Sequence, residues 1–347
     1  MINLSEARLK KIVVHKVGNK SLEEGIVLSE NLMPIEDEGL LRLLIKYFLS
    51  AFSGNEMYHF YNDVSLDMNE VYVIAKRIFE NTDSLLVHSE GLAKHLHSCS
   101  MHPKIKGGEL YVAWFRGLTI DDKSVDAIGI FKSETKEDYL KLNDDMQVLS
   151  LDYAEGINTN KLDKGCIIFN TDEELGYQVC IIDNLNKQTE AQYWKNDFLN
   201  IKPVKNEFHQ TNQLLGIAKQ FVTKQLTEDF QVSKTDQIDL LNRSVDYFKT
   251  HDTFDKEEFE TNVFHHEDII GSFRKFDENY RKDYEIEVED KFDISHEAVK
   301  KQAKNFKSIL KLDKNFHIYI HGSQDLIEQG IDEKGRKFYK LFYQEEN

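Results

Sequence analysis

Residues 153–170 read YAEGINTNKLDKGCIIFN, and the apolar segment YQVCIID follows at residues 177–183. Short apolar runs that are bounded by turn-forming residues predict β-strands. The polar piece TDEE at residues 171–174 separates the two runs. We therefore expect neighbouring antiparallel strands at residues 165–170 and 178–183.

Three earlier segments extend the expected sheet towards the N-terminus. Period-two alternation or short apolar runs occur at residues 109–116, 125–132 and 147–153. Turn-rich polar pieces separate most of them, such as DDK at residues 121–123, and this arrangement is typical of an antiparallel meander. We expect these segments to join the two strands above in the sheet of one domain.

Helices are predicted ahead of the sheet. Residues 40–51 (LLRLLIKYFLSA) are densely apolar and helix-like. Asp67 and Glu70 fit a capping box before a helical apolar repeat, and Ser84 opens another helix that runs to about Cys99. The first domain is therefore expected to begin with helices and to continue with strands.

The helical period returns after the expected sheet and indicates a second domain. Two segments, residues 214–222 and 238–248, carry apolar side chains at helical spacing. The polar piece at residues 227–236 lies between them and is the expected boundary. We predict an N-terminal domain at residues 1–230 and a C-terminal domain at residues 231–347.

Strand patterns appear again near the C-terminal end. Residues 316–320 (FHIYI) alternate apolar and polar side chains, and a second strand candidate at residues 338–343 follows a turn at residues 332–335. The predicted fold class is α+β. It comprises an N-terminal domain with helices and an antiparallel sheet, and a smaller C-terminal helical domain closed by a terminal β-hairpin.

Cysteine usage and hydropathy bear on the cellular compartment. Cys99, Cys166 and Cys180 are an odd number without metal-type spacing, which indicates packed thiols in a reducing compartment. The first residues lack the apolar segment of a signal peptide, and no run of about 18 apolar residues occurs. We expect a cytoplasmic protein that does not enter a membrane.

The formal net charge of −17 opposes nucleic-acid binding by the surface as a whole, because Lys and Arg supply affinity for polyanions. The negative charge is concentrated, however. Residues 251–300 hold 16 acids and 7 bases, a net of −9, whereas residues 301–347 hold 7 acids and 9 bases, a net of +2. Residues 201–250 hold 7 bases and 6 acids. Local basic surface is therefore available on either side of the acidic segment.

The most concrete pattern for a polyanion site lies in a helix predicted at residues 295–312. Apolar residues at helical spacing predict a buried stripe of Val299, Ala303, Phe306 and Leu310. Lysines repeat this spacing one position later, about 100° around the helix: Lys300, Lys304, Lys307, Lys311 and Lys314. Such a basic rail can follow a phosphate backbone. The alternative is a solvated helix face whose long lysines cover the rim of the core.

Two further groups of basic residues are candidates for phosphate contacts. The first interleaves rings and positive charge before a long helix: Tyr193, Trp194, Lys195, Lys202 and Lys205. Such a group can stack bases and hold phosphates, or its rings can anchor the helix to the sheet. The second group comprises Arg336, Lys337 and Lys340 on the expected terminal hairpin. These side chains either contact phosphates or are edge-strand charges that prevent unwanted strand pairing.

Two clusters raise the question of an enzyme. His95, His97, Cys99 and His102 form H-x-H-x-C-x-x-H, which has no standard zinc spacing. The run His265, His266, Glu267 and Asp268 offers ligands for a divalent cation, but it equally suits a charged helix start. The sequence contains no Walker loop, G-x-G-x-x-G, G-x-S-x-G or H-E-x-x-H motif. We expect no catalytic residues, no metal site and no cofactor.

Three blocks of the chain carry a resemblance to a known family. They are INTNKLDKGCIIFN at residues 157–170, the region from YWKNDFL to FVTKQL at residues 193–226, and FHIYIHGSQDLIEQG at residues 316–330. In these blocks, and in the order of its elements, the chain resembles bacterial nucleoid-associated proteins of the NdpA type. The resemblance implies two domains and binding to the chromosome. Family members are strongly basic between the sheet and the long helix, whereas this chain has only KPVK at residues 202–205 before Asn206 and Glu207.

The resemblance and the lysine pattern together predict a non-enzymatic nucleoid-associated protein in the cytoplasm. It would bind DNA with little sequence preference through local basic surface, with these candidate contacts: Lys300, Lys304, Lys307, Lys311, Lys314, Lys202, Lys205, Arg336 and Lys337. DNA is the expected partner, a chromosome-associated protein and a second copy of the chain are further candidates, and the sequence leaves the oligomeric state open.

Two alternatives remain at the level of sequence. In the first, the acidic residues 252–293 engage a basic partner, so that the protein is an interaction adaptor for a DNA-bound protein. In the second, the chain is a metal-dependent nuclease in genome defence. A pull-down with and without nuclease distinguishes the adaptor from DNA bridging, and incubation of duplex DNA with magnesium or manganese tests the nuclease.

Overall fold

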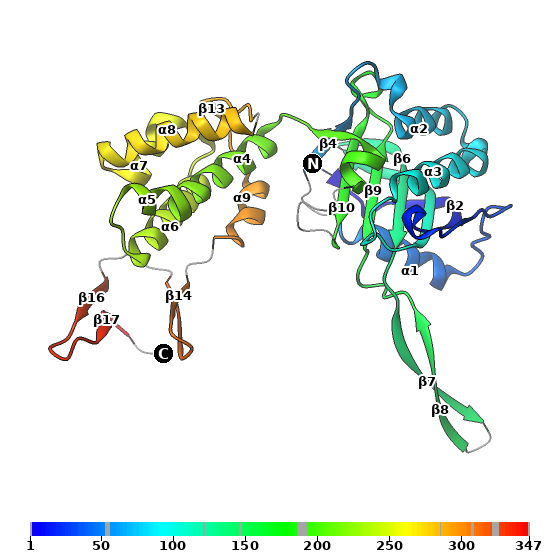
Figure 1. Cartoon of the computed structure of the whole chain (residues 1–347). Coiled ribbons are helices and arrows are strands. Elements are labelled where there is room, and N and C mark those ends of the chain that lie inside the picture. The colour runs from blue at the N-terminus through cyan, green and yellow to red at the C-terminus, as the bar shows by residue number, and fades with distance from the viewer. Residues whose placement is uncertain are drawn as a thin grey trace. The chain divides into compact units, whose positions relative to one another are not determined.

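A computed structural model of the chain describes residues 2–52, 56–120, 122–145, 148–185, 193–284, 286–306, 309–320 and 326–345. The chain forms two compact units, Met1–Val204 and Lys205–Asn347 (Figure 1). The predicted boundary after residue 230 therefore falls inside the second unit. The reason is that the helices on both sides of this boundary share one apolar core. The fold class is α+β, as the sequence predicts.

A nine-stranded antiparallel sheet forms the centre of the first unit, in the order β11-β4-β10-β9-β6-β5-β2-β3, with β1 paired to β5. Its strands are β1 (Ile2–Asn3), β2 (Arg8–Val17), β3 (Ile26–Val27), β4 (Met57–Phe60), β5 (Gly108–Ile120), β6 (Lys123–Ser133), β9 (Lys164–Phe169), β10 (Gln178–Asp183) and β11 (Ile201–Pro203).

The stretch at residues 153–170 contributes the central strand β9, which pairs with β6 and β10. All six residues of β9 are buried. Cys166 and Ile168 pack into the core on one face of the sheet, and Ile167 and Phe169 pack into the core on the other. A strand that is covered on both faces has no solvent side, which explains why its sequence is an apolar run without alternation.

Helices cover both faces of this sheet. One face is covered by α1 (Glu38–Leu49), and the other by α2 (Glu70–Glu80), α3 (Leu85–Cys99) and the π-helical turn η6 (Trp194–Leu199). The N-cap of α2 is Asn69, whose side chain accepts a hydrogen bond from the Tyr72 amide at 2.9 Å. The predicted capping box from Asp67 is therefore wrong, because Asp67 lies in the 3-10 turn before the helix.

A separate two-stranded hairpin, β7 (Glu137–Asp145) and β8 (Val148–Gly156), is inserted between β6 and β9. Figure 1 shows it extending away from the sheet of its own unit. Residues 147–153 were predicted to lie in the meander, but the strand that contains most of them pairs with β7 instead. In the central sheet β6 pairs directly with β9, and β7 lies outside the predicted strands.

Two lysines lie opposite each other inside the first unit, at the paired positions Lys132 and Lys164 of β6 and β9. The Lys132 ammonium donates to the Lys106 carbonyl at 2.7 Å, to Glu134 Oε1 at 3.0 Å and to the Tyr193 hydroxyl at 3.1 Å. Lys164 is held by the Asp183 carboxylate at 2.7 Å. Burial lowers the pKa of Lys132, and the Glu134 carboxylate opposes this shift. The network joins β6 to the segment that begins η6.

The second unit is a helical bundle with a core rich in phenylalanine, including Phe221, Phe248, Phe254, Phe259 and Phe273. Its elements are α4 (Glu207–Gln220), the π-helical turn η7 (Phe221–Gln225), α5 (Leu226–Asp229), α6 (Lys234–Thr250), β12 (Thr253–Asp255), α7 (Lys256–Phe264), α8 (Glu267–Asp283), β13 (Lys291–Asp293) and α9 (His296–Ala303).

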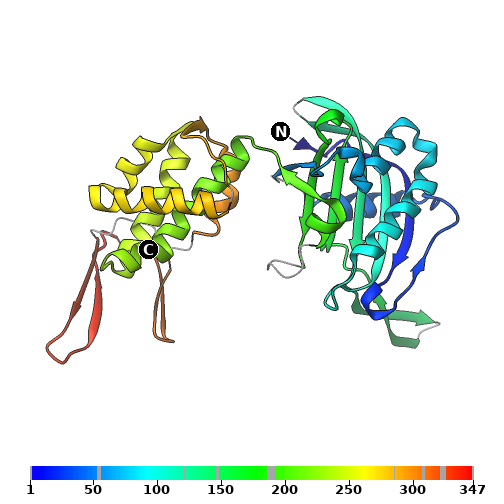
Figure 2. The ribbon, with the colours of Figure 1, turned by 45° about the horizontal axis from the view of Figure 1, so that its top comes forward.

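Two hairpins follow the bundle, β14 (Ile309–Leu312) with β15 (Phe316–Tyr319), and β16 (Ile327–Ile331) with β17 (Lys337–Leu341). Figures 1 and 2 show both hairpins extending from the same end of the bundle. A small cluster centred on Ile238, Leu310 and Ile320 joins them to α6. The predicted terminal hairpin is confirmed. No helix within the described ranges is long and apolar enough to cross a membrane.

Candidate nucleic-acid interface

The lysines predicted to lie on one helix are divided among several elements. Helix α9 ends at Ala303, so Lys300 lies on the helix and Lys304 is its C-terminal cap. Lys311 lies in β14, and Lys314 lies in the turn that joins β14 to β15. The helix predicted at residues 295–312 and its continuous basic rail are therefore wrong. Lys307 lies outside the described residues.

The break in the predicted helix follows from a hairpin signal. Leu310 pairs with Ile318 across β14 and β15, and the turn between the strands begins at Asp313, whose φ of 52° lies in the left-handed region that Asp tolerates. The residues DKN between two alternating segments mark such a turn. Val299 and Leu310 are buried as predicted, but in two different apolar clusters.

Four of these lysines carry charges that no carboxylate of the described residues neutralises. We call Lys300, Lys304, Lys311 and Lys314 the C-terminal lysine set. All four are exposed, and none forms an ion pair with another described residue. An unpaired ammonium keeps its charge for a phosphate, which it binds as a point charge with three donors. Lys301 is the neighbour that the predicted spacing missed, and its ammonium lies 5.7 Å from the centroid of the Phe208 ring.

The other candidate residues differ in their availability to phosphate. Lys205 is paired with Glu287, and Arg336 Nε lies 2.7 Å from Asp332 Oδ2. Hydrogen bonds from Arg336 lower the pKa of Asp332, so this pair is charged at neutral pH. Lys337 is exposed and has no ion pair among the described residues.

Lys202 lies on β11 in the first unit, whereas the other candidates belong to the second unit. Its side chain is exposed, and its ammonium lies 3.3 Å from the centroid of the Tyr61 ring. A cation held against an aromatic face already has a partner. Lys202 and Lys205, which are close in sequence, therefore belong to different units and have different partners.

Tyr193 and Trp194 are structural anchors. Their exposed fractions are only 4% and 0%, so neither ring can stack on a base. Trp194 Nε1 donates to the Gly165 carbonyl at 3.3 Å, and the Tyr193 hydroxyl donates to Glu134 Oε1 at 2.8 Å. The stacking interpretation of this segment is wrong, and the anchoring interpretation is confirmed.

The first His-Cys cluster has a structural role around His95. The Nδ1 atom of His95 lies 2.9 Å from Glu70 Oε2, and its Nε2 atom lies 2.9 Å from the Phe198 carbonyl oxygen. Because each ring nitrogen faces an acceptor, neither offers a lone pair to a metal or to the Cys99 thiol 3.9 Å away. Burial raises the pKa of Cys99, which makes a reactive thiolate less available.

The second candidate cluster lies at a helix junction. His265 follows the end of α7, and His266 is the N-cap residue of α8, whose first turn contains Glu267 and Asp268. These residues form the charged helix start that the sequence offers as the alternative to a metal site. Across the residues that the structure describes, no group of three or more His, Cys, Asp or Glu side chains is placed to hold a metal ion.

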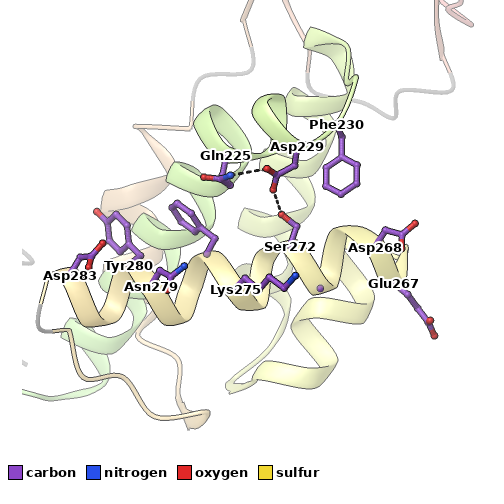
Figure 3. Close-up of a pocket in the computed structure, with 12 residues that line it drawn as sticks. Gln225, Asp229, Phe230, Glu267, Asp268, Ser272, Lys275, Asn279, Tyr280 and Asp283 are labelled. Atoms are coloured by element: carbon purple, nitrogen blue, oxygen red, sulfur yellow. Dashed lines mark hydrogen bonds between the residues drawn. The ribbon is translucent and has the colours of Figure 1, made fainter.

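An open groove of about 760 Å³ runs along α8 beside the end of α5 (Figure 3). Four carboxylates and one ammonium line it: Asp229, Glu267, Asp268, Asp283 and Lys275. Gln225 and Ser272 donate hydrogen bonds to Asp229, and they lower its pKa. The groove therefore carries a net charge of −3, which repels DNA and attracts a cationic group.

Comparisons with known proteins identify the family. The family described as nucleoid-associated protein YejK matches residues 13–336. This match covers most of the 347 residues and confirms the resemblance to the NdpA type, which is the same family. No individual curated protein matches the chain.

Proposed function

Because the chain belongs to the family of the nucleoid-associated protein YejK, we propose that it is a non-enzymatic protein of the cytoplasmic nucleoid that binds duplex DNA with little sequence preference. The C-terminal lysine set is the observation that carries this proposal. Lysines that contact phosphates supply affinity without reading bases. Lys337 on β17 adds a fifth unpaired charge, while Lys202, Lys205 and Arg336 contribute less because each already has a partner.

The acidic segment does not prevent this binding, because many of its carboxylates are neutralised inside the second unit. Asp277 is 1% exposed and lies 2.6 Å from both Lys256 Nζ and Arg281 Nε. Glu260, also 1% exposed, lies 2.6 Å from Arg274. Charges paired in this way project little field into solvent. Exposed charges are screened over about 10 Å at 0.1 M salt, so each unpaired lysine acts mainly on its own neighbourhood.

A salt titration of duplex binding tests the proposal. Each phosphate contact contributes a slope of about −0.9 to a plot of log affinity against log salt concentration. The five unpaired lysines therefore predict a slope of about −4.5. The measurement is fluorescence anisotropy of short labelled duplexes with the intact protein, over a range of sodium chloride concentrations.

Two controls accompany the titration. Duplexes of unrelated sequence should give the same slope and similar affinities, because phosphate contacts carry no sequence information. The DNA should also remain intact during long incubation with magnesium or manganese. Absence of binding at low salt, or a slope near zero, would sink the proposal.

The acidic groove favours a second candidate function, that of an adaptor for a basic, chromosome-associated protein. Three of its carboxylates lie on α8 and the fourth, Asp229, ends α5, and all four lack the dense pairing of Asp277. A lysine-rich segment of a partner would meet complementary charge there, mainly with a gain in association rate. Self-association of the chain would add to the proposed DNA binding, because two copies would contact more phosphates per particle.

The substitution Asp268→Lys tests the adaptor function. Charge reversal at the groove is expected to weaken binding of a short lysine-rich peptide roughly five- to tenfold, because it replaces attraction with repulsion. Isothermal titration calorimetry at low salt measures the effect. The matched control is Glu278→Lys, which has the same charge change on the same helix outside the groove lining. Equal losses in the two variants would exclude the groove as the binding site.

A further inference from the structure

The β7–β8 hairpin has one apolar face and one polar face. Leu140 pairs with Tyr153 and Leu142 pairs with Leu151, and paired residues project to the same side of a ribbon. Leu149 lies on this side too, because alternate residues of a strand share a face. We call these five residues the hairpin face. The opposite side carries polar pairs such as Lys141 with Asp152 and Asn143 with Ser150.

The hairpin face is open to solvent. The exposed fractions are 75% for Leu140, 65% for Leu142, 67% for Leu149, 70% for Leu151 and 71% for Tyr153. None of the five belongs to an apolar cluster of the described chain. An isolated two-stranded hairpin is only marginally stable in water, and contiguous exposed apolar surface indicates an interaction site. The hairpin therefore needs a partner on this face.

The base of the hairpin is fixed to the first unit. Asn158 Nδ2 donates to Glu137 Oε2 at 3.0 Å, and Lys136 lies 3.0 Å from Glu109 Oε1. The Asp163 carboxylate accepts the amides of Glu134 and Thr135 at 2.7 and 2.8 Å. These contacts hold the connection where the hairpin leaves the sheet. A partner can therefore bind the ribbon without rearrangement of the core.

The charge of the hairpin excludes nucleic acid and anionic membrane as that partner. Residues 137–156 contain six acids and one base, a net of −5. A polyanion would be repelled. The same side of the ribbon also carries Asp138 paired with Glu155 at the base, and Asp144 paired with Leu149 at the other end. The two central pairs of the hairpin face, Leu140 with Tyr153 and Leu142 with Leu151, are therefore free of charge. Its partner must therefore be an apolar protein surface.

We propose that the hairpin face packs against the hairpin face of a second copy of this chain. Like faces fit because their central apolar pairs meet, while the carboxylates at the two ends of the ribbon stay at the solvated rim of the contact. Two apolar ribbon faces in contact make a small β-sandwich, the usual arrangement for strands with one apolar side. A two-fold contact is closed, so it covers both hairpin faces and leaves no apolar face for further association.

The size of the face is sufficient for a reversible dimer. A large apolar side chain removes on the order of 100 Å² from water when it is buried. Ten such side chains in the two copies bury on the order of 1,000 Å², which is the lower limit for a specific interface. The dimer is therefore expected to form at micromolar concentrations and to exchange with monomer.

Sedimentation analysis of the intact protein without DNA tests the proposal. Over about 1–100 µM, the mass should rise from 40.6 kDa towards twice that value. The double substitution Leu142→Thr with Leu151→Thr should raise the dimer dissociation constant at least about 100-fold, because threonine keeps strand propensity but removes the apolar contact. The matched control, Tyr139→Thr, removes a ring from the opposite side and should leave the dimer unchanged.

Salt provides a second readout. Each hairpin has a net charge of −5, so sodium chloride should strengthen the dimer by screening repulsion, whereas it weakens phosphate contacts.

A deletion variant that lacks residues 137–156 should be monomeric. It tests the proposal even if the double substitution unfolds the hairpin. A monomeric wild type at the highest concentration overturns the proposal, whether the second unit or another protein covers the face. Dimerisation that survives either variant, or that weakens with salt, overturns it too. None of these outcomes depends on DNA binding.

Discussion

Replacement of the C-terminal lysine set by glutamine is expected to weaken duplex binding about 1,000-fold near 0.15 M salt. Each lost phosphate contact reduces the salt slope by about 0.9, which corresponds to about five- to sixfold in affinity at this concentration. Four losses multiply to about three orders of magnitude and leave a slope near −0.9 from Lys337. Fluorescence anisotropy over a salt series gives both quantities.

The control for this variant changes the same number of charges in the same unit. Lys205, Lys249, Lys291 and Lys340 are exposed, and each is paired with a carboxylate. Their replacement by glutamine lowers the net charge equally but should change the salt slope by less than one contact. If both fourfold variants lose the same affinity, net charge alone governs binding and the C-terminal lysine set is not a contact surface.

The central sheet could be predicted because its strands are buried on both faces. KGCIIF in β9 and QVCIID in β10 are apolar runs between turn residues, and no competing structure suits them. The helices α1 and α3 were predicted for a similar reason, since each presents an apolar stripe to the sheet. Local pattern is sufficient where burial alone decides the structure.

The lysine region could not be predicted because two local patterns compete there. Residues 295–312 fit a helical repeat, but residues 309–319 also fit two short strands around a DKN turn. The hairpin is favoured because Leu310 packs with Ile238 of α6, a contact that is distant in sequence. The interaction of Lys132 with Tyr193 was hidden for the same reason, since 61 residues separate them. A lysine is available to DNA only if no partner that is distant in sequence already holds its ammonium. The sequence could therefore identify the candidate lysines but not which of them are available.

Substitution of Lys132 by Met is expected to destabilise the first unit by about 3–5 kcal/mol, the usual cost of breaking a buried ion pair. The side chain of Lys132 is 0% exposed and that of Glu134 is 3% exposed. Loss of the ammonium leaves this carboxylate buried beside an unpaired carbonyl. Urea unfolding followed by tryptophan fluorescence measures the change in this unit, because both tryptophans of the chain, Trp114 and Trp194, are buried within it.

Two comparisons identify the cause of that loss. The double variant Lys132→Met with Glu134→Gln should be more stable than the single variant, because the amide removes the uncompensated charge while its oxygen still accepts from the Tyr193 hydroxyl. Lys94→Met breaks an exposed ion pair, in which the side chains of Lys94 and Glu90 are 60% and 37% exposed. This substitution should lower the free energy of unfolding by less than about 1 kcal/mol. A loss below about 1 kcal/mol for Lys132→Met, or no recovery in the double variant, would show that the buried ammonium does not hold η6 against the sheet. The anchored Tyr193 and Trp194 would then owe their position to apolar packing and to their own hydrogen bonds with Glu134 and Gly165.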